Sequence, residues 1–220
     1  MPEVDAGVKA GISLYSKFLL SIYDWYLLGY CCRFLWKCPA RNMLALYNEH
    51  VSGNHLDIGV GTGYFMDRCA FPTPHPHITL MDLSENSLGA ARKRLARYQP
   101  EAVLGNALES FDLSGRTYDS IGMMNLLHCL PGDMMTKSVV LDHAKAALNP
   151  GGTLFGSTIF YKGAKRSVLA TLTMKTVNRR GYMTNLEDDI VVLADALRRR
   201  FAASEVKTIG CMALFHASDA

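Results

Sequence analysis

The sequence has little of what marks several classes of protein. Its 220 residues include 23 Lys and Arg and 20 Asp and Glu. The resulting net charge of +3 is too small to indicate a protein that binds nucleic acid. Its six cysteines include no Cys-x-x-Cys pair, and no spacing of histidines is typical of a metal site. No internal repeat, low-complexity segment or linker is evident. We therefore expect a single domain that binds neither nucleic acid nor a metal ion.

Long uncharged apolar runs are also missing. Residues 12–36 are very apolar and aromatic. Lys17, Asp24 and Arg33 interrupt them, so no uncharged stretch reaches the length of about 18 residues that a membrane span needs. The chain begins Met-Pro-Glu-Val-Asp, without the basic start of a signal peptide. We expect one or two helices here that cap the domain of a cytoplasmic protein; contact with a membrane surface is the alternative.

Strand-like and helix-like segments alternate along the rest of the chain. This alternation predicts a mostly parallel sheet with helices on both faces. The last two strands have almost no chain between them, so they must be antiparallel neighbours, because a parallel connection needs a dozen or more residues. The expected strands are 54–60, 78–82, 102–105, 118–127, 153–160, 206–211 and 212–217, and the expected helices are 63–70, 87–98, 136–148, 163–180 and 186–201.

Residues 55–65, His-Leu-Asp-Ile-Gly-Val-Gly-Thr-Gly-Tyr-Phe, carry the most specific signal. An apolar strand delivers Asp57 into a turn that holds Gly59, Gly61 and Gly63. Glycines at alternate positions let the backbone turn sharply and approach a ligand closely. The helix that follows points its free N–H groups into the turn. The segment predicts a small-molecule site at the carboxyl end of a strand; a glycine-rich turn without a ligand is the alternative.

The spacing argues against a dinucleotide. The fingerprint Gly-x-Gly-x-x-Gly needs a glycine where the sequence has Tyr64, and Asp57 would bring a negative charge close to a pyrophosphate. A carboxylate there suits a cationic or donor-rich ligand. The pattern Asp-x-Gly-x-Gly-x-Gly resembles motif I of the class I S-adenosylmethionine (SAM) methyltransferases. The resemblance implies a Rossmann-like α/β fold with a seven-stranded, mostly parallel sheet and an antiparallel last strand, and a loop that wraps the amino-acid end of SAM.

Polar residues follow the next two strands. Asp82 ends the second strand, about 20 residues after Gly59, where a carboxylate can accept both hydroxyls of a ribose; capping of the next helix is the alternative. Asn106 follows the third strand, and its amide can both donate to and accept from the edge of adenine; an ordinary turn residue is the alternative. The resemblance implies the ribose and adenine roles.

The fourth strand ends in Asn-Leu-Leu-His, which resembles the motif IV region of small-molecule methyltransferases. The resemblance places Asn125 under the methionine part of SAM and His128 in the substrate space. His128 is the candidate catalytic residue, because a histidine can take a proton from an oxygen nucleophile near neutral pH; a buried structural histidine is the alternative. Tyr15, Tyr23 and Trp25 could contact the cation, with core packing as the alternative. The expected cofactor-binding residues are Tyr23, Asp57, Gly59, Gly61, Thr62, Gly63, Asp82, Leu83, Asn106, Ala107 and Asn125.

The domain divides into four parts: an N-terminal helical lid (1–40), a SAM-binding core (41–160), a substrate-side segment (161–186), and a closing helix with two strands (187–220). The lid and the substrate-side segment contain many aromatic residues and methionines, which suit an apolar or aromatic small molecule. The Asn/Asp-Pro-Pro-Tyr-type tetrapeptide that methyltransferases use on nucleobases and protein amides is absent, and so is a large recognition domain. These absences favour a metabolite as the acceptor.

The sequence therefore predicts methyl transfer from SAM to an oxygen or nitrogen atom of a small apolar or aromatic metabolite, in a secondary-metabolite pathway, by a monomer or homodimer. A cyclase or pericyclase on the same fold is one alternative, and it would bind SAM without transferring the methyl group. A non-catalytic protein that docks residues 12–36 on a membrane or a partner is another. Tyr64 argues against a dehydrogenase, because the dinucleotide fingerprint needs a glycine at this position.

Overall fold

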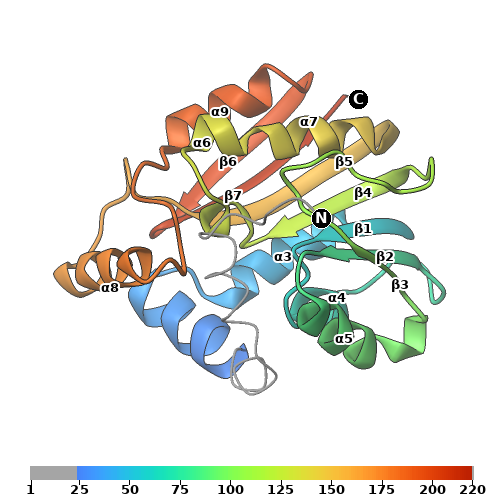
Figure 1. Cartoon of the computed structure of the whole chain (residues 1–220), viewed down its shortest axis with the longest axis horizontal. Helices are drawn as coiled ribbons and strands as arrows, with labels where there is room; N and C mark the ends of the chain where they lie inside the picture. Colours follow the sequence, from blue (N-terminus) through green and yellow to red (C-terminus); the bar gives the residue numbers. More distant parts are fainter. Residues whose placement is uncertain (1–23, 220) are drawn as a thin grey trace.

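Seven strands form one sheet in the computed structural model, which describes residues 24–219 (Figure 1). Their order is β3-β2-β1-β4-β5-β7-β6, with β1 to β5 parallel and β7 antiparallel to both of its neighbours. The predicted α/β class, with its antiparallel last strand, is confirmed. The strands are β1 (Asn54–Ile58), β2 (His77–Asp82), β3 (Glu101–Leu104), β4 (Tyr118–Met124), β5 (Leu148–Ile159), β6 (Ala203–Ile209) and β7 (Met212–Ser218).

Helices cover both faces of the sheet, as Figure 1 shows. Two 3₁₀ turns, η2 (Ala96–Tyr98) and η3 (Leu127–Cys129), complete the described helical segments. One layer comprises the π-helix η1 (Asp24–Leu35), α3 (Ala40–His50), α4 (Tyr64–Arg68), α5 (Glu85–Arg94) and α8 (Val168–Arg179), and the other comprises α6 (Met134–Lys137), α7 (Val139–Ala146) and α9 (Ile190–Arg198).

The alternation of side chains along β1 decides what each layer contacts. Leu56 and Ile58 pack into the core shared with α7 and α9, whereas His55 and Asp57 face the α3 side. Both polar side chains are buried. A central parallel strand is usually apolar on both faces, so the two polar residues need partners, and α3 supplies one of them.

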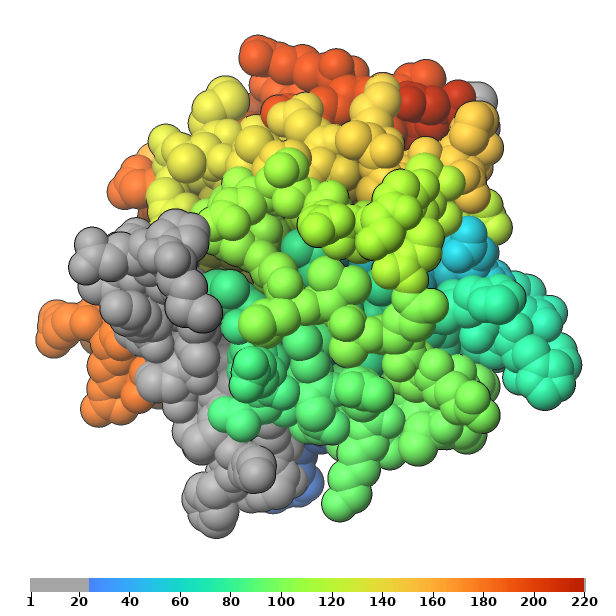
Figure 2. Space-filling view, turned by 45° about the vertical axis from the view of Figure 1, so that its right-hand side comes forward, coloured from blue at the N-terminus to red at the C-terminus, as the bar shows by residue number. Residues whose placement is uncertain are grey.

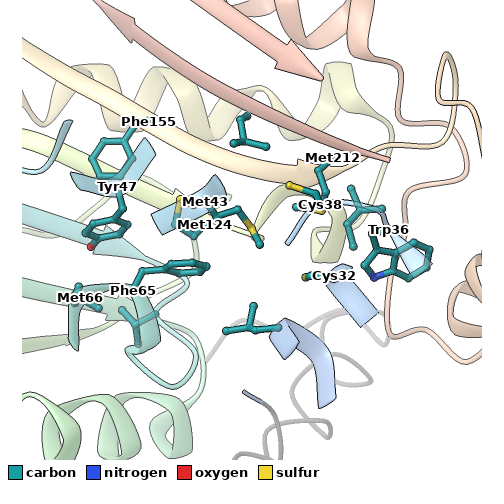
Figure 3. Close-up of a cluster of buried hydrophobic side chains, with 14 of the residues drawn as sticks. Cys32, Trp36, Cys38, Met43, Tyr47, Phe65, Met66, Met124, Phe155 and Met212 are labelled. Carbon is teal, nitrogen blue, oxygen red and sulfur yellow. The ribbon is translucent and has the colours of Figure 1, made fainter. Parts of the chain in front are cut away.

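The core on the α3 side combines aromatic rings with sulfur-containing side chains. Tyr47 of α3 lies edge-on to Phe155, with ring centroids 5.0 Å apart, and stacks against Phe65 at 6.1 Å (Figure 3). Unbranched methionine fits irregular gaps between such rings. This packing holds α3 against the central strands and places the Tyr47 hydroxyl beside β1. The labelled sulfur-containing neighbours are Cys32, Cys38, Met43, Met66, Met124 and Met212.

Two local features move element boundaries from their predicted places. The strand predicted to reach residue 127 ends before Asn125, because Asn125 has a left-handed backbone with φ +58°. The helix predicted over 136–148 is two helices that meet at Ser138. Its start lies earlier than predicted, because the Asp133 carboxylate caps the N-terminus of α6.

The structure describes the predicted N-terminal cap from Asp24 onward. Tyr15 and Tyr23 lie outside the described residues. The η1 segment is wound more widely than an α-helix: at its end the Trp36 N–H donates to the carbonyl of Cys31, five residues back. Within residues 24–219, no helix has both the length and the apolar character needed to cross a bilayer.

Candidate active site

Two adjoining cavities open at the carboxyl ends of β1 to β4, where open α/β sheets bind their ligands. The larger measures about 710 Å³ with its open mouth and lies past β2 and β3; the smaller measures about 450 Å³ and surrounds the glycine loop. Gly59 and Asn125 line both cavities. Every predicted cofactor residue among residues 24–219 lines one of them: Asp82, Leu83, Asn106, Ala107 and Asn125 the larger, and Asp57, Gly59, Gly61, Thr62, Gly63 and Asn125 the smaller.

The glycine loop has a backbone that other residues rarely adopt. Gly59, Gly61 and Gly63 have φ values of +74°, +51° and +72°. A Cβ atom on Gly59 would lie 2.8 Å from Leu126, and one on Gly63 would lie 3.3 Å from Ala91, whereas one on Gly61 would meet nothing within 4 Å. The outer glycines are therefore packed against the protein, and Gly61 faces open space in the smaller cavity.

Asp82 connects the end of β2 to the glycine loop. Its Oδ1 accepts the Ser84 N–H at 2.8 Å, and its Oδ2 accepts the Gly61 N–H at 3.3 Å. Ser84, rather than Asp82, is the N-cap of α5, where it accepts the Ser87 N–H. Burial raises the pKa of Asp82 to about 6. A carboxyl group with this pKa is ionised at neutral pH and can accept hydroxyl protons in the larger cavity.

Asn106 lines the larger cavity while also closing a turn. Its Oδ1 accepts the Leu108 N–H at 3.1 Å, and its Nδ2 donates to Glu109 at 3.1 Å. It therefore combines the turn role with a place on the cavity wall, beside Ala107. The segment from this turn to β4 (residues 105–117, green) covers part of the face shown in Figure 2.

Asn125 lies where the two cavities meet. Its N–H donates to the Ser157 carbonyl at 2.8 Å, and its Oδ1 accepts the Ser157 hydroxyl at 3.0 Å. These bonds to β5 hold it in the left-handed conformation, which is uncommon for a residue other than glycine and is found at functional sites. Sequence spacing indicated the residue but not this backbone.

The N-terminal helix η1 forms a wall of the smaller cavity through Leu28. Asp24, at its start, accepts the Thr62 hydroxyl at 2.7 Å and pairs with Arg94 of α5 at 2.7 Å. Arg94 also donates to the Thr62 hydroxyl at 3.1 Å. These three side chains, here called the Asp24 latch, join η1, the glycine loop and α5. Trp25 is 77% exposed and lines neither cavity.

His128 lies in the 3₁₀ turn after Asn125 but lines neither cavity. Its Nδ1 accepts the Ile159 N–H at 3.2 Å and lies 3.3 Å from the Thr158 hydroxyl. Burial, together with the nearby charge of Lys137, lowers the pKa of His128 to about 3. The imidazole is therefore neutral at physiological pH, with its proton on Nε2.

Residues next to His128 line the larger cavity instead. These are Leu126, Cys129, Leu130 and Pro131, and sequence reasoning missed them as cavity residues. Spacing does not fix which side chain of a 3₁₀ turn points outward, so no signal in the sequence separates Cys129 from its neighbour. Burial raises the pKa of the Cys129 thiol to about 12, so it is a neutral, apolar part of the wall.

A buried ion pair lies behind η3, at the end of residues 161–186. Lys137 Nζ lies 2.8 Å from both carboxylate oxygens of Asp188 and donates to the Thr184 carbonyl at 2.5 Å. Both charged side chains are 0% exposed. The Thr184 N–H donates to the His128 carbonyl at 2.9 Å. This group of residues therefore supports the segment rather than facing a ligand.

Comparison with known proteins identifies the family. A family profile described as a methyltransferase domain matches residues 56–154. The chain is 38% identical over 214 residues to the demethylluteothin O-methyltransferase of Streptomyces thioluteus, which covers 97% of this chain and 93% of that protein. The chain belongs to the class I SAM-dependent methyltransferases.

Other proteins resemble this methyltransferase over nearly its whole length. It is 34% identical over 219 residues to the physcion biosynthesis cluster O-methyltransferase of Aspergillus chevalieri, covering 99% of this chain and 98% of that protein. Its fold matches that of a DhpI complex with S-adenosylhomocysteine (SAH), with a TM-score of 0.67 at 16% identity, covering 99% of this chain and 100% of that one. The protein is a SAM-dependent methyltransferase with SAM as its cofactor.

The groups around the two cavities suit this cofactor. SAM carries an ammonium group at one end and a ribose with two free hydroxyls toward the other. The smaller cavity contains Asp57, which is 4% exposed, and the larger contains Asp82. Carboxylates are acceptors for both kinds of group.

Proposed function

We propose that this enzyme transfers the methyl group of SAM to an oxygen or nitrogen atom of a small apolar or aromatic metabolite in a secondary-metabolite pathway. The observation that carries the proposal is the pair of adjoining cavities, each with one carboxylate and joined at Asn125. The names of the two relatives, O-methyltransferases of demethylluteothin and of the physcion biosynthesis cluster, support an oxygen acceptor.

In the proposed arrangement, the smaller cavity takes the amino-acid end of SAM and the larger takes its nucleoside. Asp57 faces the ammonium group, and Asp82 accepts the ribose hydroxyls. Asn106 faces adenine, with Leu83 and Ala107 beside the ring. The residues assigned to the methionine part are Gly59, Gly61, Thr62, Gly63 and Asn125.

When bound, SAM supplies an electrophilic methyl carbon that a nucleophile attacks in line with the sulfonium. The chain contributes alignment and a dry site. Leu28 on one side and Cys129 on the other present apolar walls that exclude water. Holding two reactants at attack distance supplies up to about 7–11 kcal/mol in well-oriented intramolecular reactions.

The hypothesis that His128 is a general base needs an imidazole that takes protons near pH 7 and reaches the acceptor. Burial holds the pKa of His128 at about 3, and the Ile159 N–H occupies Nδ1. These observations favour the structural alternative. We therefore propose that His128 supports η3 and the substrate-side segment, and that the acceptor reaches the methyl group as a phenolate, another activated oxygen or a neutral amine.

We further propose that residues 1–40 act as a lid and that residues 161–186 provide the acceptor side of the site. Leu28 and the Asp24 latch support the first assignment. Contacts of Thr184 with His128 and Lys137 support the second. All six cysteines are free, which is typical of a reducing cytosol.

Calorimetry with SAM, SAH and NAD tests the cofactor site. Gly61→Arg puts a large side chain into the open space of the smaller cavity, so we expect SAH affinity to fall at least about 100-fold. Gly115→Arg is the matched control, because Gly115 also has positive φ (+74°) and open space around it but lines neither cavity. Binding of NAD in place of SAH, or an equal loss in both variants, would contradict the site.

Product mass tests the reaction. Incubation with SAM and a panel of phenolic and amine metabolites is expected to give products heavier by one methylene unit, together with one SAH per turnover. An isomerised product without a mass gain would instead identify a cyclase or pericyclase.

A further inference from the structure

A chain of hydrogen bonds runs behind the smaller cavity, on the α3 side of the sheet. The Tyr47 hydroxyl donates to Asp57 Oδ2 at 2.7 Å and lies 2.7 Å from His55 Nε2. His55 Nδ1 lies 2.8 Å from the Ser120 hydroxyl, which lies 2.8 Å from that of Ser52. The Ser52 hydroxyl ends the chain 2.9 Å from a backbone carbonyl of β1. We call this series of five contacts the Asp57 chain.

The fold leaves space for the Asp57 chain and keeps it dry. Parallel pairing of β1 with β4 sets His55 opposite Ser120 and Asp57 opposite Gly122. A Cβ atom on Gly122 would lie 3.0 Å from Asp57 Oδ2 and 3.2 Å from the His55 ring. Gly122 has no positive φ, so a side chain is missing there for space and not for backbone conformation. Phe155 stacks on the His55 ring at 5.8 Å.

Backbone groups anchor the far end of the Asp57 chain. The Ser52 N–H donates to the Ser120 hydroxyl at 2.9 Å, and the Asn54 N–H donates to the Ser52 hydroxyl at 3.2 Å. The chain therefore runs from the backbone around β1 to one carboxylate oxygen of Asp57, and each of its side chains is held by the next.

We propose that Tyr47 and His55 are positioning residues for the cofactor: Tyr47 binds Oδ2 of Asp57 and His55 holds the Tyr47 hydroxyl in place, so that Oδ1 faces the ammonium group. The inference rests on the proposed function, which assigns the smaller cavity to the amino-acid end of SAM. Within residues 24–219, Tyr47 donates the only hydrogen bond to this carboxylate. A buried carboxylate without compensation would destabilise the protein before the cofactor binds, and the Asp57 chain compensates it from behind.

Other ionisable groups near Asp57 do not join the Asp57 chain. Cys69 stands at the end of α4, and burial raises the pKa of its thiol to about 12, so it is neutral. Asp82 lies across the cavities, where backbone N–H groups of Gly61 and Ser84 bind it. Neither side chain has a hydrogen bond to the Asp57 chain in the described structure.

The test compares two ligands and two tyrosines. Tyr47→Phe removes the hydroxyl that binds Asp57, so we expect SAH to bind about tenfold more weakly. Binding of 5′-methylthioadenosine, which lacks the ammonium group, should change less than about twofold. Tyr118→Phe is the matched control, because the Tyr118 hydroxyl is equally buried and donates to Thr79 at 3.0 Å, away from Asp57. It should change neither affinity.

The outcomes separate this assignment from the proposed function. A wild-type protein that fails to bind SAH would overturn both. SAH binding by the wild type, with Tyr47→Phe weakening both ligands equally or neither, would overturn the assignment alone, because a merely structural tyrosine does not discriminate between the two ligands.

A second variant keeps the assignment testable if Tyr47→Phe fails to fold. His55→Gln removes the ring that holds the Tyr47 hydroxyl, so we expect SAH to bind more weakly and 5′-methylthioadenosine to change less than about twofold. An equal loss for the two ligands, or no loss for either, would overturn the role of His55.

Discussion

Two regions at the carboxyl edge of the sheet differ in what their charged side chains bind. In the half that we propose binds SAM, here called the cofactor half, Asp57 and Asp82 at the ends of β1 and β2 bind protein donors on one side and line a cavity on the other. In the half that we propose receives the methyl acceptor, here called the acceptor half and lying past β4, Lys137 and Asp188 bind each other and are 0% exposed. The cofactor half therefore presents polar groups to a ligand, whereas the acceptor half uses them to hold a wall in place.

Sequence distance explains this difference. The residues of the glycine loop lie within one strand–turn–helix unit, so their geometry follows from local backbone rules. Lys137 and Asp188 are 51 residues apart, so only the packing of the tertiary structure brings them together. The pairing of charged side chains in the acceptor half thus depends on tertiary contacts. Substitutions in one half should therefore leave the other half unchanged.

Loss of the buried ion pair in the acceptor half should have the largest effect, and this effect is on stability. Lys137→Met leaves the buried carboxylate of Asp188 without a partner, so we expect the free energy of unfolding to fall by about 3–5 kcal/mol. Urea unfolding measures this loss. Lys162→Met is the control, because it breaks an exposed pair with Glu187 and should leave the unfolding midpoint unchanged. Similar losses in the two variants would contradict the difference between buried and exposed pairs.

The cofactor half should respond to acid. Burial raises the pKa of Asp82 to about 6, and ribose hydroxyls need the ionised form, so SAH affinity should fall about tenfold between pH 7.5 and pH 5. Calorimetry across this range measures the change. Asp82→Asn should bind weakly at every pH and show a flat profile; a flat profile in the wild type would remove Asp82 from the site.

Stability of the ligand-free enzyme should move in the opposite direction with pH. The folded pKa of Asp82, about 6, lies above the unfolded value of about 3.9. The contribution of this group to stability is therefore complete below about pH 4 and is lost as the pH rises through 6. Thermal unfolding of the wild type and of Asp82→Asn should show a difference that grows over this window in favour of the variant.

Opening the Asp24 latch should have a smaller effect. Asp24→Asn removes the ion pair with Arg94 and weakens the bond from Thr62, so η1 should leave the smaller cavity more often. We expect SAH to dissociate about three to five times faster in stopped-flow measurements. Asp67→Asn breaks the Arg97 pair, which does not involve η1, and should leave the rate unchanged.

Replacing His128 should have the smallest effect on chemistry. Because its imidazole is already neutral, His128→Asn should lower kcat/KM less than about threefold and leave its pH profile unchanged. Loss of a general base would instead cost about 10²–10⁴-fold and remove a titrating limb. A loss of that size in a folded variant would restore His128 as the base.

The cofactor half could be predicted from the sequence because its side chains lie at or next to the carboxyl ends of strands. The turn type of Gly59 to Gly63 and the place of Asp82 need only local rules and the order of parallel strands. The direction of His128 could not be predicted, because a 3₁₀ turn of three residues sets one side chain inward and the next outward according to what packs behind it. In this turn, the hydrogen bond from the Ile159 N–H to His128 Nδ1 holds the histidine inward.

The Asp57 chain lies between these two cases. The spacing of His55 and Asp57 places both on one face of β1, so the strand pattern is sufficient to predict a buried polar pair. It is not sufficient to predict Tyr47 as the partner of this pair, because the rotation of α3 over the sheet depends on Phe65 and Phe155. The pair therefore follows from the sequence, whereas its partner follows from the packing of α3.

The left-handed backbone of Asn125 has a consequence for how this enzyme can diversify. Few residue types other than asparagine, aspartate and glycine tolerate that conformation, and position 125 borders both cavities. Few substitutions are therefore tolerated at position 125, whereas η1 and α8 contain no residue with positive φ. Under the proposed function, substitutions in η1 and the 161–186 segment would change the acceptor while Asn125 stays the same.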